Sequence, residues 1–123
     1  MLNRTNIFML YGVVMIGYGV WFLFAPVHAT MLYMGEGQAN VEGLSFILKW
    51  CGLFLFGLGA VYVVNRGSGG DAARQMSMAA IVVSLIAIVF SYQGAQAYGP
   101  QHYSSLGLNV VWVLLHGSLL KGS

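Results

Sequence analysis

The chain has 123 residues, of which 59% are hydrophobic and only 7% are charged, with a formal net charge of +2. A soluble domain carries about 25% charged residues, and a soluble fold of this size leaves about a third of its surface in water, so the composition argues against a water-soluble protein. The low charge, without a basic patch among interleaved aromatic residues, argues against nucleic acid as a partner. We therefore expect an integral membrane protein whose surroundings are the lipid bilayer.

The first apolar segment predicts a membrane helix over residues 7–24. Gly12 and Gly19 lie two turns apart and share one face, whereas Gly17 faces elsewhere. Pro26 is expected to end this helix, because the residue before a proline is displaced from the α region. The segment has no small-x-small cleavage site, so we expect a retained helix rather than a signal peptide.

A short helix is predicted over residues 26–34, lying in the membrane interface. Pro26 suits the first position of a helix, and Gly35 is expected to end it. The next residues, 35–43, are polar and are expected to form an exposed loop.

A second membrane helix is predicted over residues 44–64, with a glycine pattern that repeats the first one forty residues later, at Gly52, Gly57 and Gly59. Each interior glycine costs about 1 kcal/mol in a soluble helix, but in a bilayer small residues let two helices approach closely. The need for small residues at helix contacts explains the similarity of the two glycine patterns better than an inverted repeat of the kind seen in transporters. Lys49 is expected to extend toward the near headgroups, with Glu42 as a candidate partner.

Two further membrane helices are predicted over residues 76–92 and 105–120. Small residues recur at helical spacing in the third helix and predict its packing face. They are Ala80, Ser84, Ala87 and Ser91. Residues 67–70 are expected to form a flexible turn, and residues 93–104 a polar loop.

The distribution of cations predicts the topology. Arg4, Arg66, Arg74 and Lys121 fall on one side of four spans, and Lys49 alone falls on the other. By the positive-inside rule, both termini are expected to be cytoplasmic. The prediction is an all-α, left-handed, membrane-spanning four-helix bundle that forms a single transmembrane domain over residues 1–123.

Asn109, Trp112 and His116 recur at spacings of three and four and therefore share one face of the fourth helix. This face could line a site for a quinone, a haem or another small ligand. The alternative is structural: Asn109 would bond across to Ser84 or Ser91, and His116 would lie near the cytoplasmic headgroups.

A second candidate site lies on the other side of the membrane. His28, Met31 and Met34 recur every three residues, and His102 lies in the other outer loop. Imidazole and thioether ligands suit Cu(I), and a His28–His102 pair could hold a haem. The alternative is an interfacial helix whose methionines and Tyr33 dip into lipid.

The layout resembles the broad group of small four-helix bacterial membrane proteins that includes the DoxX-like families. The shared features are architectural: an Ala-Pro end to the first helix, a glycine after the outer segment, a glycine-spaced second helix, an aspartate before the third helix and a Gly-Pro loop before the fourth. They correspond here to Ala25-Pro26, Gly35, Gly52, Gly57, Gly59, Asp71 and Gly99-Pro100. The resemblance implies a role as a partner of other membrane proteins, in some families oxidoreductases, and assigns no catalytic residue.

No helix centre carries an Asp, Glu, Lys or Arg, which argues against a self-contained ion-coupled transporter. No nucleophile constellation, phosphate loop or carboxylate pair is present either, so we do not expect an enzyme. The leading hypothesis is a non-enzymatic subunit of a homo-oligomer or larger complex in the bacterial cytoplasmic membrane. The alternatives are a copper or haem protein linked to redox chemistry, and an oligomeric channel or carrier for small solutes.

Overall fold

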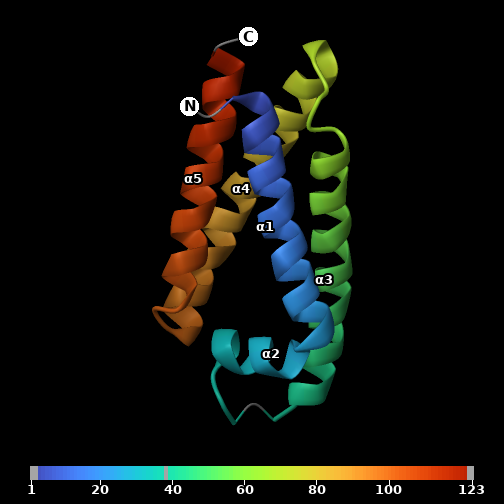
Figure 1. The fold of residues 1–123 in the computed structure, drawn as a ribbon. Helices are drawn as coiled ribbons and strands as arrows, with labels where there is room; N and C mark the ends of the chain where they lie inside the picture. The colour runs from blue at the N-terminus through green and yellow to red at the C-terminus, as the bar shows by residue number, and fades with distance from the viewer. Residues whose placement is uncertain (1–2, 38, 122–123) are drawn as a thin grey trace. The chain divides into compact units, whose positions relative to one another are not determined.

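The computed structural model describes residues 3–37 and 39–121. Over these residues, all regular secondary structure is helical. The helices are α1 (Arg4–Phe24), α2 (Pro26–Met34), α3 (Val41–Val64), α4 (Gly70–Tyr98) and α5 (His102–Lys121) (Figure 1). All except α2 are long and apolar enough to cross a membrane. The prediction of an all-α chain with four helices of this kind is confirmed.

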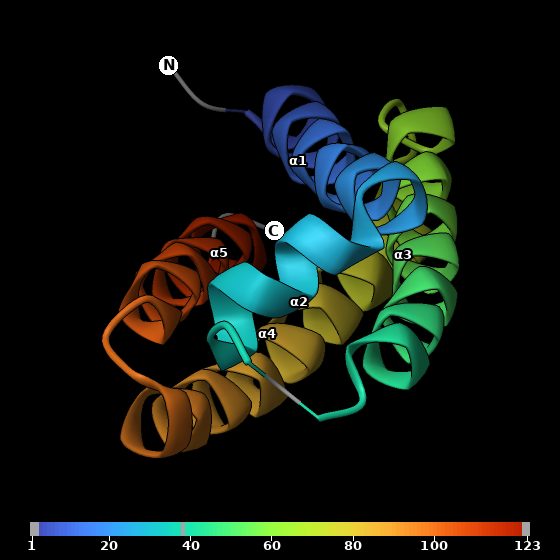
Figure 2. The same cartoon turned by 90° about the horizontal axis from the view of Figure 1, so that it is seen from below.

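Tertiary contacts divide the chain into two compact units. Residues 9–64, which include most of α1 with α2 and α3, form the α1–α3 unit. The residues up to Phe8 and those from Asn65 onward form the α4–α5 unit. In the α1–α3 unit, α1 and α3 run side by side in opposite directions, and α2 lies across the end where α1 finishes and α3 begins (Figures 1 and 2). In the α4–α5 unit the two long helices form an antiparallel hairpin (Figure 1).

The start of α1 and both ends of α2 follow local rules. The side chain of Asn3 accepts a hydrogen bond from the Asn6 amide at 2.9 Å, which satisfies one of the free N–H groups at the start of α1. Pro26 occupies the first turn of α2. Gly35 ends α2 with a positive φ of 86°, and its amide donates to the Met31 carbonyl. The short helix predicted over residues 26–34 is therefore present.

Helix α3 begins at Val41 rather than at residue 44, so the predicted polar loop was too long. Asn40 is the reason, because its side-chain oxygen accepts a hydrogen bond from the Gly43 amide at 3.2 Å and caps the helix. Glu42 then lies in the first turn, where a negative charge interacts favourably with the helix dipole.

Helix α4 shows the largest error of the sequence-based bounds. It covers Gly70–Tyr98, against a prediction of 76–92, and α5 begins at His102 rather than at residue 105. The glutamines and alanines after residue 92 are polar or small, but they are good helix formers and continue the helix past its apolar part. It ends only at Gly99, where φ is 127°.

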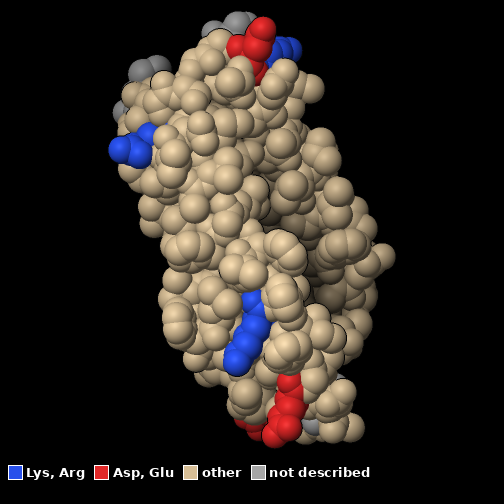
Figure 3. Space-filling model, turned by 90° about the vertical axis from the view of Figure 1, so that its right-hand side faces the viewer, with Lys and Arg blue, Asp and Glu red and all other residues tan. Residues whose placement is uncertain are grey.

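Side chains on α4 are distributed in the reverse of a soluble helix. The buried residues are small: Ala73, Ser77, Ala80, Ser84 and Ser91. The exposed residues are large and apolar: Val82, Val83, Leu85, Ile86, Val89 and Phe90. On the face shown in Figure 3, charged side chains gather toward the two ends, one Lys or Arg side chain crosses the lower half, and the rest of the surface is uncharged. Small residues inside and large apolar residues outside are typical of helices that pack in lipid, where burial of apolar area between helices gains little.

Candidate functional site

Four of the glycines bring α1 and α3 into backbone contact. A Cβ atom at Gly12 would lie 2.6 Å from the carbonyl oxygen of Gly59, and one at Gly19 would lie 2.7 Å from that of Gly52. These distances are too short for any side chain, so the two helices approach as closely as they do only because hydrogen replaces Cβ. A Cβ at Gly17 or at Gly57 would meet nothing within 4 Å.

A pair of buried hydroxyl groups joins α2 to α3. The Oγ1 of Thr30 lies 3.1 Å from the Oγ of Ser45, and it also donates to the carbonyl oxygen of Pro26 at 2.8 Å. Because a hydroxyl has one proton, Ser45 is the donor within the pair. Sequence reasoning missed this contact, since single Thr and Ser residues at these positions carry no recognisable pattern.

The first candidate metal ligand, His28, is already engaged. The indole N–H of Trp21 donates to the Nδ1 of His28 at 3.1 Å, which leaves only Nε2 for another ligand. Met31 is exposed and Met34 is half-buried. The described residues contain no group of three His, Cys, Asp or Glu side chains positioned to hold a metal ion. A Cu(I) site built from His28 and the methionines stays a prediction.

His102, the fourth candidate, belongs to the α4–α5 unit and has a packing role there. A Cβ at Gly94 would lie 2.5 Å from the Nδ1 of His102, so the imidazole ring fills the space beside this glycine of α4. The ring centroids of Tyr98 and His102 lie 6.0 Å apart. The structure thus places His102 against the neighbouring helix of the hairpin.

The candidate cofactor face on α5 is only partly as expected. The side-chain amide of Asn109 donates to the carbonyl oxygen of Ser105 at 2.8 Å, within its own helix. The expected bond from Asn109 to Ser84 is wrong, because the buried Ser84 Oγ has no hydrogen-bond partner among the described residues. Trp112 and His116 are both buried, and the ring centroids of His116 and Phe8 lie 5.8 Å apart. The role of this face in cofactor binding stays a prediction.

Aromatic rings gather where α1 meets α2. The ring centroids of Trp21 and Tyr33 lie 5.7 Å apart, and those of Phe22 and Tyr33 lie 6.0 Å apart. Burial raises the pKa of Tyr33 to about 12, and Tyr18 adds to the shift. The phenol of Tyr33 is therefore neutral at physiological pH.

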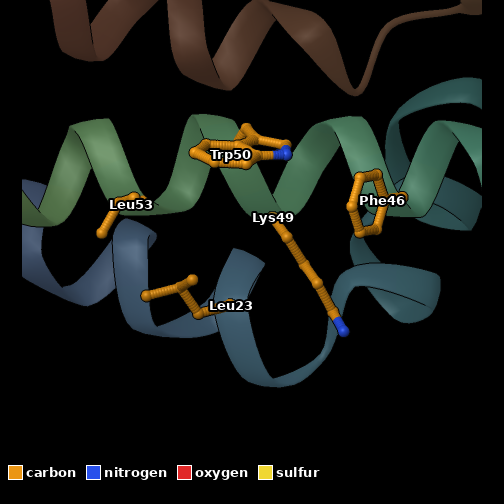
Figure 4. Close-up of a pocket in the computed structure, with 5 residues that line it drawn as sticks. All are labelled: Leu23, Phe46, Lys49, Trp50 and Leu53. Carbon is orange, nitrogen blue, oxygen red and sulfur yellow. The ribbon is translucent and has the colours of Figure 1, made fainter.

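A pocket of about 200 Å³ lies between α1 and α3, and sequence reasoning missed it. Its lining residues are Leu23, Phe46, Lys49, Trp50 and Leu53 (Figure 4). The four residues from α3 recur at spacings of three, one and three, which places them on one helical face. The sequence signal for this pocket is a lysine near aromatic residues in an apolar helix, and by itself it predicts only a side chain that reaches toward the headgroups.

Lys49 also lacks the partner expected for it. Among the residues that the structure describes, no carboxylate lies within ion-pair distance of its ammonium group, and Glu42 makes no ion pair with it. The two residues are seven positions apart, about 10 Å along the helix, which is too far for a direct contact.

Comparisons with known proteins assign no family to the chain. No family model matches it, and no curated protein and no solved structure matches it. The resemblance to the DoxX-like group therefore stays a prediction, and the function has to be argued from the geometry of the chain itself.

Proposed function

We propose that this chain is a non-enzymatic integral membrane subunit that packs against other copies of itself or against the subunits of a larger membrane complex. Its four long apolar helices would form a bundle with both termini on the cytoplasmic side of a bacterial inner membrane. The reversed distribution of side chains on α4, small residues buried and large apolar ones exposed, supports lipid as the surroundings.

The observation that carries the subunit role is a set of helix glycines at which a Cβ would meet nothing within 4 Å; two of them, Gly17 and Gly57, lie within the α1–α3 unit. Gly17 and Gly57 are exposed, and a Cβ at either position would meet nothing. An interior glycine costs a helix about 1 kcal/mol relative to alanine. At these two positions no close helix contact within the α1–α3 unit compensates for that cost. Small exposed residues allow the close approach of a helix from another subunit.

Purification in a mild non-ionic detergent, followed by size-exclusion chromatography with light scattering, tests the proposal. We expect an oligomer or a complex with a co-purifying membrane protein. The variant Gly57→Leu should reduce the assembly while the helical content of the monomer persists. Val61→Leu is the matched control, because an exposed side chain already covers the backbone one turn further along α3.

The outcome that contradicts the proposal is a wild-type protein that elutes as a lone monomer with no co-purifying partner. An assembly that Gly57→Leu and Val61→Leu affect equally would contradict the assignment of the Gly57 face.

A further inference from the structure

The structure points to a lipid site in the pocket between α1 and α3. We propose that this pocket binds one anionic glycerophospholipid, with its phosphate at the Lys49 ammonium and an acyl chain over Leu23 and Leu53. The inference requires that α1 and α3 lie in a membrane, but it does not depend on the oligomeric state proposed above.

The charge of Lys49 is the first argument. Lys49 lies eight residues after the start of α3, about 12 Å along the helix, within a segment apolar enough to span a membrane. A cation at such a depth is costly unless it reaches an anion or the headgroup region. Among the residues that the structure describes, no carboxylate is within ion-pair distance of Lys49, and an anion from outside the chain would satisfy its charge. A lysine is a frequent phosphate ligand in proteins, where it acts as a point charge.

The shape and chemistry of the pocket supply the second argument. Its lining consists of leucine and aromatic side chains together with the carbon stem of Lys49. Figure 4 shows the stem extending from α3 beside Leu23, with the ammonium pointing away from Trp50 and Leu53. The arrangement therefore offers a cation at one end and an apolar surface at the other, which matches an amphipathic lipid and not a free phosphate ion. Trp50 adds an amphipathic aromatic ring of the kind that settles at membrane interfaces.

The choice of an anionic lipid follows from the net charge of the ligand. A zwitterionic phosphatidylcholine also has a phosphate, but its choline compensates the charge locally. A phosphatidylglycerol carries a net negative charge and gains the full attraction of the ammonium. One lysine near a membrane surface contributes about 1 kcal/mol toward an anionic lipid, which corresponds to about fivefold in affinity.

Native mass spectrometry of the full-length protein in a non-ionic detergent tests this proposal. Phosphatidylglycerol and phosphatidylcholine with the same acyl chains are added at equal concentration. We expect the wild type to retain phosphatidylglycerol preferentially, and Lys49→Gln to lower this preference about fivefold. Lys49→Arg should retain it, and Lys121→Gln, a cation at the end of α5, is the matched control and should leave it unchanged.

A second variant tests the apolar part of the site. Leu53→Trp fills the pocket and leaves the cation in place, so it should weaken binding of phosphatidylglycerol. An excess of soluble glycerol phosphate should not displace the lipid. Circular dichroism of each variant checks that its helical content is retained.

Equal retention of the two lipids by the wild type would overturn the proposal, and so would an unchanged preference in Lys49→Gln. Displacement by glycerol phosphate, or undiminished binding in Leu53→Trp, would show that no acyl chain occupies the pocket and would overturn it as well. The same spectra report the number of subunits, so a failure of the lipid site is distinguishable from a failure of the proposed subunit role.

Discussion

Replacement of Gly19 by alanine is the most direct test of the contact between α1 and α3. The new Cβ would lie 2.7 Å from the Gly52 carbonyl oxygen, 2.7 Å from the Phe56 amide nitrogen and 2.9 Å from the Phe56 Cβ. All three are backbone or Cβ atoms, so no flexible side chain can move aside. The helices must separate locally by about 0.7 Å to restore the 3.4 Å at which ordinary contact begins.

The magnitude follows from two opposing effects. Alanine favours the helix over glycine by about 1 kcal/mol, whereas overpacking a close contact costs about 1–3 kcal/mol. Gly17→Ala on the same helix gains the first effect without the second, because a Cβ there meets nothing within 4 Å. We therefore expect Gly19→Ala to be less stable than Gly17→Ala by about 1–3 kcal/mol.

The assay is unfolding in mixed micelles with a rising fraction of sodium dodecyl sulfate, followed by circular dichroism. The difference between the two unfolding midpoints reports the cost of disturbing the contact between α1 and α3, because both variants carry the same change in helix propensity. Adding Gly52→Ala to Gly19→Ala should cost less than the sum of the single variants, since both disturb one contact. Equal midpoints for Gly19→Ala and Gly17→Ala would refute the close approach of α1 and α3.

Three further predictions concern the hydroxyl pair, the buried phenol and the topology. Thr30→Val leaves the Ser45 hydroxyl buried without its partner and should lower the free energy of unfolding by about 1 kcal/mol in the same micelle assay. Burial raises the pKa of Tyr33 to about 12, so its neutral form stabilises the fold fully below pH 10, and this stabilisation is lost as the pH rises toward 12. Tyr33→Phe should therefore remove a component near pH 12 from the tyrosinate absorbance titration and improve tolerance of alkali. In a Cys51→Ala background, Ser68→Cys should react with an impermeant maleimide only after the cells are opened, because the turn after α3 is expected to be cytoplasmic.

Each of these predictions has a clear contrary outcome. An unchanged midpoint in Thr30→Val would show that the pair contributes nothing to stability. A wild-type titration identical to that of Tyr33→Phe would contradict the shifted pKa. Labelling of Ser68→Cys in intact cells would reverse the proposed orientation.

The local features of the fold could be predicted from the sequence because they depend on nearby residues. Pro26 and Gly35 restrict the backbone where they stand, and they delimit α2 as expected. The apolar residues predict too short a helix for α4, because polar helix formers beyond them continue the helix to Tyr98. Hydropathy reports which residues favour lipid, not where the hydrogen-bonded helix stops.

The candidate sites depended on contacts that spacing cannot predict. The interval between Asn109 and His116 correctly indicates a shared face, but not that the Asn109 amide bonds to its own helix. The sequence pattern predicts His28 as a free metal ligand, whereas in the structure the Trp21 indole donates a hydrogen bond to its Nδ1. The pocket at Lys49 needs Leu23 from α1, which is distant in the sequence.

The sequence by itself determined that the chain is helical, that four of its helices are long and apolar enough to cross a membrane, and that a short helix follows the first of them. These properties follow from hydropathy and local backbone restrictions. Only the tertiary structure decided which glycines form a contact: Gly12 and Gly19 meet Gly59 and Gly52, whereas Gly17 and Gly57 remain exposed. The physical reason is that helical periodicity specifies which residues share a face, but the partner of that face depends on how the helices pack.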